Sequence, residues 1–168
     1  MAYDQHRKAS ESIVARCAVL TLSDTRTEAT DKSGRRIRDL LEAAGHRIAH
    51  YQVLPDEPAT LDALLGELLA RQEVDAVLTN GGTGVSPRDR TVEVVERRLD
   101  RPLPGFGELF RMLSWQEIGS GAMISRAAGG VAKGKPLFAM PGSTPAVELA
   151  MTKLILPEIG HLVKELRK

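Results

Sequence analysis

The sequence predicts an α/β domain in which helices cover both faces of a mostly parallel sheet. Two observations support this prediction. Short apolar runs rich in β-branched residues alternate with amphipathic helical segments through short connections, which is the pattern of a parallel sheet. In addition, each of the first three expected strands ends in a polar cluster, as strands of open α/β sheets do at a ligand-binding edge.

Composition limits the classes of function that the chain can have. With 168 residues, it has the length of one domain that can bury its own core. Its net charge of +1 argues against a dedicated nucleic-acid or membrane-surface binder, because such proteins usually carry a marked basic excess. Cys17, the only cysteine, lies in an apolar run and excludes an internal disulfide. No apolar run has the length of a membrane span or a signal peptide, so we expect a cytoplasmic protein.

Residues 1–12 are polar and mixed in charge, and we expect them to form a flexible N-terminal arm. Residues 13–168 are expected to form a single domain, because no linker, repeat or low-complexity tract interrupts them. The apolar, β-branched run 13–22 predicts the first buried strand. Asp31 or Ser33 can then cap a helix that carries apolar residues on one face.

Two further strands are expected over residues 46–54 and 75–79, on either side of a second helix. Pro58 suits the first turn of this helix, since its fixed φ is compatible with a helix start. A leucine stripe on one face lasts only a few turns, which indicates a core contact rather than a coiled coil. The stripe consists of Leu61, Leu64, Leu65, Leu68 and Leu69.

In the second half of the chain, helices are expected over residues 89–99 and 108–117. The second of these is apolar over most of its surface, which predicts packing against the domain or against another subunit. The next strands are expected over residues 122–125 and 136–140, joined by a connection rich in glycine and basic residues. Pro157 must kink the final helix or restart it as a second helix.

The carboxyl ends of the first three expected strands carry the polar side chains that a ligand site needs. Right-handed crossovers bring these ends to one edge of the sheet. The third strand leads into a glycine-rich loop, residues 81–84, which permits positive φ angles and a close approach of backbone N–H groups to an anion. On its own, such a loop is as compatible with an ordinary turn as with a phosphate cradle.

Acidic side chains near this loop are candidates for Mg²⁺ binding through carboxylate oxygens. Asp56 and Asp89 are the better candidates, and Asp24 is a third. Asp89 is also placed to cap the following helix, a structural role that would not exclude a catalytic one. Nearby guanidinium groups can stabilise phosphoryl charge, although each alone is more often a solvated surface residue; they belong to Arg88, Arg90 and Arg126.

Other phosphate, metal and nucleophile motifs fail. The dinucleotide pattern G-x-G-x-x-G is broken by Pro87, and a near match to the P-loop at residues 129–136 has Pro136 where the hydroxyl should stand. The four histidines lie on different expected elements, which argues against a zinc site. Ser125 lacks the G-x-S-x-G context of a nucleophile elbow.

Several motifs in a fixed order make the chain similar to the MoaB/MogA family of molybdenum-cofactor biosynthesis proteins. The resemblance covers residues 14–159, nearly the whole chain. The run 108–119 resembles the MoaB branch in particular. The motifs that carry the resemblance are 21–26 (TLSDTR), 31–34 (DKSG), 80–84 (NGGTG) with Arg88, Asp89 and Thr91, 105–111 (GFGELFR), 124–127 (ISRA) and 141–143 (PGS).

This resemblance implies a three-layer α/β/α fold that assembles as a trimer or a hexamer. It implies a nucleotidyltransferase that binds molybdopterin and ATP with Mg²⁺ and transfers AMP to the terminal phosphate of molybdopterin, releasing pyrophosphate. The expected partners are these substrates, further copies of the chain and other molybdenum-cofactor biosynthesis proteins, with neither nucleic acid nor a membrane among them. The alternative left open within the family is a non-catalytic molybdopterin-binding or carrier protein of the MoaB branch.

Motif by motif, the resemblance assigns roles to individual residues of this chain. Asp56 and Asp89 match the family's two catalytic acids and are the expected Mg²⁺ ligands. The residues expected to bind the nucleotide or molybdopterin are Ser23, Asp24, Thr25, Gly81, Gly82, Thr83, Gly84, Arg88, Thr91, Ser125, Arg126, Pro141, Gly142 and Ser143.

Overall fold

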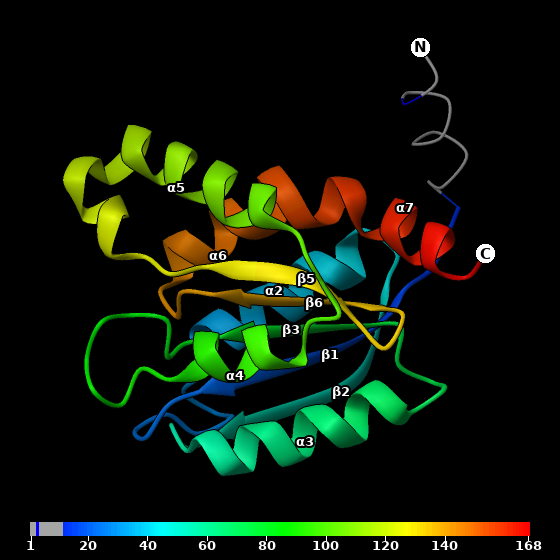
Figure 1. The fold of residues 1–168 in the computed structure, drawn as a ribbon, viewed down its shortest axis with the longest axis horizontal. Helices are drawn as coiled ribbons and strands as arrows, with labels where there is room; N and C mark the ends of the chain where they lie inside the picture. Colours follow the sequence, from blue (N-terminus) through cyan, green and yellow to red (C-terminus); the bar gives the residue numbers. More distant parts are fainter. Residues whose placement is uncertain (1–2, 4–11) are drawn as a thin grey trace.

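The computed structural model describes residue 3 and residues 12–168, so the expected arm over residues 1–12 lies almost entirely outside the described part. Within the described part, a six-stranded sheet has helices on both faces, which confirms the predicted α/β fold (Figure 1). The strand order is β2-β1-β3-β6-β5-β4. The strands are β1 (Arg16–Leu22), β2 (Arg47–Leu54), β3 (Ala76–Asn80), β4 (Arg101–Pro102), β5 (Ala128–Ala132) and β6 (Lys135–Met140).

The sheet is mostly parallel, as expected. β2, β1, β3 and β6 run parallel, whereas β5 pairs antiparallel with both β6 and the short edge strand β4. In Figure 1, α3 and α4 cover one face of the sheet, and α2, α5, α6 and α7 cover the other. The helical segments are α2 (Lys32–Ala43), α3 (Pro58–Ala70), α4 (Thr91–Arg98), α5 (Pro104–Ile118), the 3₁₀ helix η1 (Gly119–Ile124), α6 (Thr144–Ala150), the π-helix η2 (Met151–Ile155) and α7 (Leu156–Leu166).

The two helix layers produce two hydrophobic cores. Alternate residues of β1 face the two layers, as the twofold period of a strand requires. Cys17 and Val19 are buried in the core shared with α2, α5, α6 and α7. Ala18 and Leu20 are buried in the second core, which contains the leucine stripe of α3. The stripe is therefore a core contact, with Leu64 as its one partly buried member.

The start of α2 is tied to the carboxyl end of the central strand. Asp31 is the cap, because its Oδ1 accepts a hydrogen bond from the N–H of Gly34 at 3.0 Å. Ser33, the alternative cap, lies buried in the first turn and donates to Oδ1 of Asn80 at 2.8 Å. Since Asn80 is the last residue of β3, this contact fixes α2 beside the loop that follows β3.

The expected strand over residues 122–125 is wrong, because these residues belong to the 3₁₀ helix η1. The strand is β5, which lies inside the expected glycine-rich connection. Packing explains its glycines: a Cβ on Gly129 would lie 2.4 Å from Cδ1 of Phe138. The near match to the P-loop is thus a β5–β6 hairpin that turns at Lys133 and Gly134, both with positive φ.

Prolines set the boundaries of the later helices. α5 begins at Pro104, four residues before the expected start, because a proline is tolerated in the first turn of a helix. α6 continues through the π-helix η2 into α7, and Pro157 lies in the first turn of α7. The chain therefore stays helical through Pro157, with the π-helix η2 before it, rather than restarting as a separate helix. No helix among the described residues is both long and apolar enough to cross a membrane.

Candidate functional site

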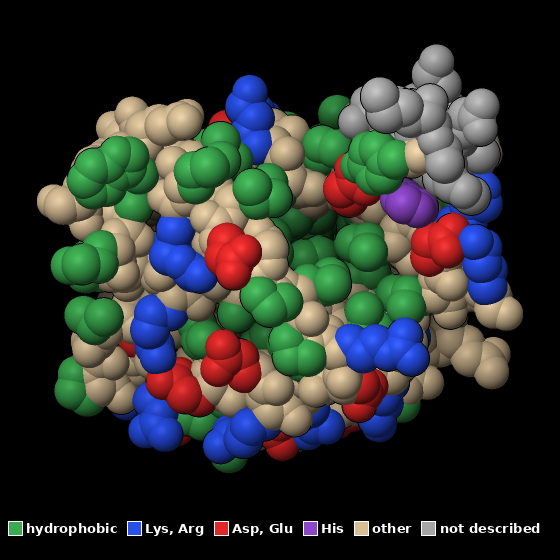
Figure 2. Space-filling model, turned by 45° about the horizontal axis from the view of Figure 1, so that its top comes forward, with side chains coloured by type: hydrophobic (Ala, Val, Ile, Leu, Met, Phe, Trp, Pro, Cys, Tyr) green, Lys and Arg blue, Asp and Glu red, His purple; other side chains and the backbone are tan. Residues whose placement is uncertain are grey.

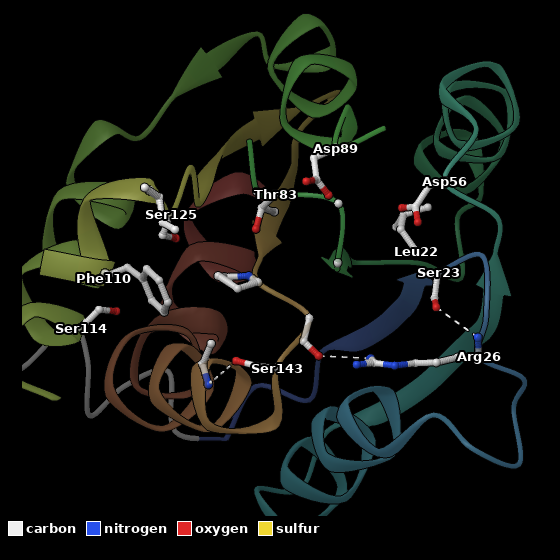
Figure 3. Close-up of a pocket in the computed structure, with 18 of the residues that line it drawn as sticks. Leu22, Ser23, Arg26, Asp56, Thr83, Asp89, Phe110, Ser114, Ser125 and Ser143 are labelled. Carbon is white, nitrogen blue, oxygen red and sulfur yellow. Dashed lines mark hydrogen bonds between the residues drawn. The ribbon is translucent and has the colours of Figure 1, made fainter. Parts of the chain in front are cut away.

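The loops that follow β1, β3 and β6 surround a cavity of about 470 Å³. Figure 3 shows Asp56 and Arg26 toward one end of this cavity, and Phe110 and Ser114 of α5 at the other. Most of the predicted site residues line it. These are Ser23, Thr25, Asp56, Gly81, Gly82, Thr83, Gly84, Asp89, Ser125, Pro141, Gly142 and Ser143.

The cavity also has walls that the sequence did not indicate. Helix α5 and η1 reach it because of how they cross the sheet edge, which an apolar periodicity does not reveal. Arg26 belongs to the motif 21–26 at the end of the first strand, but it was not among the residues expected to bind ligand. The additional lining residues are Leu22, Arg26, Phe110, Ser114, Ile118, Gly121, Ile124 and Ala146.

The loop after β3 needs its glycines for both conformation and space. Gly81 and Gly82 have φ angles of 94° and 66°, which other residues rarely adopt. A Cβ on Gly82 would lie 2.2 Å from Oγ1 of Thr91 and 3.2 Å from Oδ1 of Asp56. Buried Thr91 does not line the cavity; its backbone N–H donates to the carbonyl of Gly82 at 3.1 Å. The loop is thus packed closely against its neighbours and lines the cavity beside the carboxylate of Asp56; we call residues 81–84 the glycine cradle.

Asp56 is an incompletely satisfied acid at this cradle. Its Oδ1 is buried and has no hydrogen-bond partner among the described residues. Burial raises the pKa of Asp56, and the negative charges of Asp24 and Asp89 raise it further. An acid in this environment gains from a nearby cation, which would supply the missing oxygen contact and offset the like charges.

Asp89 closes its own loop rather than capping α4. Its Oδ2 accepts from the N–H of Ser86 at 2.9 Å, while its own N–H donates to the carbonyl of Ser86 at 3.0 Å. The N-cap position of α4 is Arg90, without a side-chain capping bond. The alternative role of Asp89 as a helix cap is therefore wrong. The turn instead fixes the Asp89 carboxylate against Gly84, where a Cβ would lie 2.7 Å from Oδ2.

Arg126 holds the glycine loop and does not line the cavity. Its Nε donates to the carbonyl of Gly84 at 2.8 Å, and its Nη2 donates to the carbonyl of Asp89 at 2.5 Å. Its Nη1 forms an ion pair with Glu93 of α4. One guanidinium group thus joins both ends of the loop 84–89 to α4, which is a structural use of a residue expected to bind ligand.

Arg88 and Asp24 likewise bind each other outside the cavity lining. The Arg88 guanidinium contacts both carboxylate oxygens of Asp24, with Nε–Oδ2 and Nη2–Oδ1 distances of 2.7 and 3.0 Å. Asp24 also accepts from the backbone N–H of Asp56 at 3.0 Å. These bonds, that from Arg88 first, lower the pKa of Asp24. Asp24 therefore joins the loops after β1, β2 and β3, and the structure does not present it as a free metal ligand.

Comparison with known proteins shows which family the chain belongs to. A family model described as "Probable molybdopterin binding domain" matches residues 18–161. Molybdenum cofactor biosynthesis protein B of Halalkalibacterium halodurans is 53% identical over 100% of this chain and 99% of its own length. The chain belongs to the MoaB branch of the MoaB/MogA family. The protein of the same name from Bacillus subtilis is 50% identical, with 100% and 99% of the two chains covered.

Solved structures of MoaB-branch proteins have the same fold. A crystal structure of a Molybdenum cofactor biosynthesis protein B has a TM-score of 0.89 and 51% identity, covering 92% of this chain and 96% of that one. The tungsten cofactor synthesizing protein MoaB from Pyrococcus furiosus has a TM-score of 0.82 and 32% identity, covering 92% and 98%. The strand order and helix layers described above are thus those of the MoaB branch.

In this MoaB-branch cavity, two chemically different ends face each other. One end combines the glycine cradle with the carboxylates of Asp56 and Asp89, so it can hold an anion beside a cation. The other end is formed by the Phe110 ring and aliphatic side chains, with the hydroxyl of Ser125 among them. That Oγ is buried and has no partner among the described residues, so it is available to a bound polar group.

Proposed function

We propose that the cavity binds molybdopterin and ATP with Mg²⁺ and transfers AMP to the terminal phosphate of molybdopterin. The observation that carries this proposal is the glycine cradle beside Asp56, whose buried Oδ1 lacks a partner among the described residues. A cradle of backbone N–H groups suits phosphate, and an unsatisfied carboxylate next to it suits the cation that accompanies a nucleotide. Membership of the MoaB branch supports the choice of molybdopterin as the second substrate.

The residues present fit Mg²⁺ held jointly by protein and substrate. Among the described residues, no group of three or more Asp, Glu, His or Cys side chains forms a metal site by itself. Mg²⁺ is usually bound through one or two carboxylates together with substrate phosphates and water. Asp56 and Asp89 would supply the carboxylates. When bound there, Mg²⁺ would neutralise charge on the phosphates of ATP.

The proposed reaction requires positioning and charge neutralisation rather than a nucleophile from the protein. An oxygen of the molybdopterin phosphate attacks the α-phosphorus of ATP, the bond from that phosphorus to the bridging oxygen breaks, and pyrophosphate leaves. The backbone N–H groups of residues 82–84 would hold the phosphates in line, since that of Gly81 already donates to the carbonyl of Met140. The bonds from Arg126 and Ser86 keep Asp89 and its loop in place before substrate arrives, so little reorganisation is needed.

The test combines purified protein with molybdopterin, ATP and Mg²⁺ and follows AMP transfer and pyrophosphate release. We expect both products to form, and a chelator to abolish their formation. Asp89→Asn should lower the rate by about a hundredfold or more, because one negative charge next to the cation is lost. Asp62→Asn, which alters an acid paired with Arg98 outside the cavity lining, is the control.

Two results would contradict this proposal. Tight molybdopterin binding without AMP transfer would make the chain a non-catalytic binding or carrier protein. A near-wild-type rate in Asp89→Asn, with its fold verified by circular dichroism, would remove Asp89 from the mechanism.

The setting we propose for the reaction is the cytoplasm, where other molybdenum-cofactor biosynthesis proteins would supply molybdopterin and take up its adenylylated form.

We also propose that the chain assembles as a trimer or a hexamer. Large apolar side chains of α5 and η1 face outward: Trp115, Ile118 and Met123 are 62%, 64% and 79% exposed. Figure 2 shows hydrophobic side chains at the end of the molecule where α5 terminates. Apolar surface of this kind commonly marks a protein contact. Light scattering on the purified protein tests the assembly, and a strictly monomeric protein would refute it.

A further inference from the structure

We infer that Arg26 is the residue of this cavity that binds a phosphate group of the ligand. The inference rests on the proposed function in one respect, namely that the ligand carries phosphate. Arg26 is the only lysine or arginine, among the described residues, that lines the cavity. The arginines near the glycine loop are committed elsewhere, Arg88 to Asp24 and Arg126 to Glu93 and two carbonyl groups.

The guanidinium group of Arg26 is held by one of its nitrogens. Nη1 donates to Oγ of Ser33 at 2.7 Å and to the carbonyl of Gly142 at 3.1 Å. These two bonds use both hydrogens of Nη1. Nε and Nη2 have no hydrogen-bond partner among the described residues, and the side chain is 36% exposed. Three N–H groups are therefore left for a ligand, while the position of the planar guanidinium fork is already set.

A buried negative charge fixes this position from behind. Oδ1 of Asp31, whose side chain is fully buried, lies 3.7 Å from Nη1 of Arg26. Burial alone would raise the pKa of Asp31, but hydrogen bonds donated by Thr21, Gly34 and Tyr51 outweigh this effect and lower it. Asp31 is thus an anion at neutral pH. It attracts the guanidinium group without occupying Nε or Nη2.

The same network connects Arg26 to three parts of the fold. Ser33 donates to Asn80 at the end of β3, and Nδ2 of Asn80 donates to Oγ1 of Thr21 in β1 at 2.8 Å. The carbonyl of Gly142 adds the loop after β6, where a Cβ on Gly142 would lie 3.1 Å from Cα of Gly81. Arg26 therefore spans from the loop after β1 to the loop after β6, as Figure 3 shows.

Binding of phosphate in this cavity requires a positively charged side chain in its lining. Asp56 and Asp89 both line it, so an anionic phosphate entering the cavity meets two carboxylates. A bound cation can screen the phosphates nearest these acids, and Arg26 supplies positive charge from the neighbouring wall. Its planar fork, with Nε and Nη2 available on one side, matches two oxygens of one phosphate.

The test compares Arg26→Gln and Arg26→Lys with a matched control, Arg36→Gln. Arg36 has similar side-chain exposure, 41%, and pairs with Glu148 on the surface rather than lining the cavity. Calorimetric titration with Mg²⁺ present measures the affinity for ATP and adenosine, and for molybdopterin with and without its phosphate. Thermal unfolding verifies that each variant is folded.

We expect Arg26→Gln to weaken binding of the phosphate-bearing ligands by about ten- to a hundredfold, the effect of one charge-assisted contact, and to leave adenosine and dephosphorylated molybdopterin unchanged. Arg26→Lys should bind with intermediate affinity, because it keeps the charge but loses the fork, and Arg36→Gln should match the wild type. Equal losses with and without phosphate would show a merely structural role, and no loss would also overturn the inference. Failure of the wild type to transfer AMP would reject the proposed reaction alone, since the binding comparison does not depend on it.

Discussion

Asp75 provides a test of how the end of the sheet opposite the cavity is stabilised. It directly precedes β3, and its side chain is only 8% exposed. Oδ2 accepts from the backbone N–H and Nε of Arg16 at 2.8 and 2.9 Å, and Oδ1 lies 2.8 Å from Nη2 of Arg167. Burial alone would raise the pKa of Asp75, but the bonds from Arg16 and Arg167 lower it from 3.8 to about 2.

This pKa sets the size and the sign of the predicted effect. The difference between 3.8 and about 2 corresponds to about 2.4 kcal/mol at 1.36 kcal/mol per pKa unit. Because both arginine side chains are 41% or more exposed, solvent screening reduces the expected value to about 2 kcal/mol. Between the two pKa values, the unfolded chain binds more protons than the folded one. The stabilisation is therefore complete above about pH 4 to 5 and is lost as pH falls toward 2.

Asp75→Asn should lower the free energy of unfolding by about 2 kcal/mol at pH 7 and the melting temperature by about 4 to 8 °C. Urea denaturation at pH 7, 5 and 3 measures this difference, which should shrink at pH 3 because Asp75 binds a proton in the unfolded chain while it stays largely ionised in the folded one. Asp62→Asn is the control. The Asp62 side chain is 43% exposed, so its ion pair with Arg98 should contribute less than about 1 kcal/mol to the free energy of unfolding. A deficit of the same size at pH 7 and pH 3 would refute the assignment to ionisation, and an unchanged stability at pH 7 would refute the role of Asp75 altogether.

Two further predictions concern the cavity. The pKa of Asp56 is raised, so the folded chain binds more protons than the unfolded one just above pH 3.8, and ionised Asp56 destabilises the fold at neutral pH. Asp56→Asn should consequently raise the melting temperature at pH 7 while it weakens binding of ATP with Mg²⁺; a lower melting temperature would contradict this sign. Arg126→Gln should accelerate amide hydrogen exchange at Asp89 and Thr91, because the bonds to the carbonyls of Gly84 and Asp89 are lost. The control is Arg98→Gln, because Arg98 joins α4 to α3 through contacts to Asp62. This variant should leave exchange at the two amides unchanged. Equal acceleration in both variants would contradict a local role for Arg126.

Much of the fold could be predicted because pattern and structure agree locally in the first half of the chain. β1, β2 and β3 are continuous apolar or alternating runs, and the helices between them have apolar faces and recognisable starts, a capping Asp31 for α2 and Pro58 for α3. The glycine loop and Asp56 could be placed at one edge because the handedness of crossovers leaves little choice of topology. β5 could not be predicted, because Gly129 and Gly130 disfavour a strand by propensity. Glycine is needed at these positions because Phe138 lies against Gly129 and the backbone of β4 lies against Gly130, too closely for a side chain at either.

The roles of the arginines show a different limit. Arg26, Arg88 and Arg126 all lie near polar loops in the sequence, and nothing in their neighbours distinguishes a guanidinium group that holds a loop from one that faces a ligand. The distinction depends on partners distant in the chain, such as Gly142, 116 residues after Arg26. Sequence motifs therefore predicted most of the lining of the cavity but did not distinguish the arginine that lines it from those that hold its loops.

The acidic side chains also differ in their roles: Asp31 and Asp75 stabilise the fold, and Asp56 is the candidate for ligand binding. Asp31 and Asp75 are buried at least as deeply as Asp56, yet several donors reach each of them and lower their pKa values. At Asp56 the pKa is raised, one buried oxygen has no partner among the described residues, and the neighbouring acids add repulsion. Protein donors thus complete the surroundings of Asp31 and Asp75, whereas we propose that a cation completes those of Asp56. Ligand binding and stability are thereby linked, so ATP with Mg²⁺ should raise the melting temperature of the wild type more than that of Asp56→Asn.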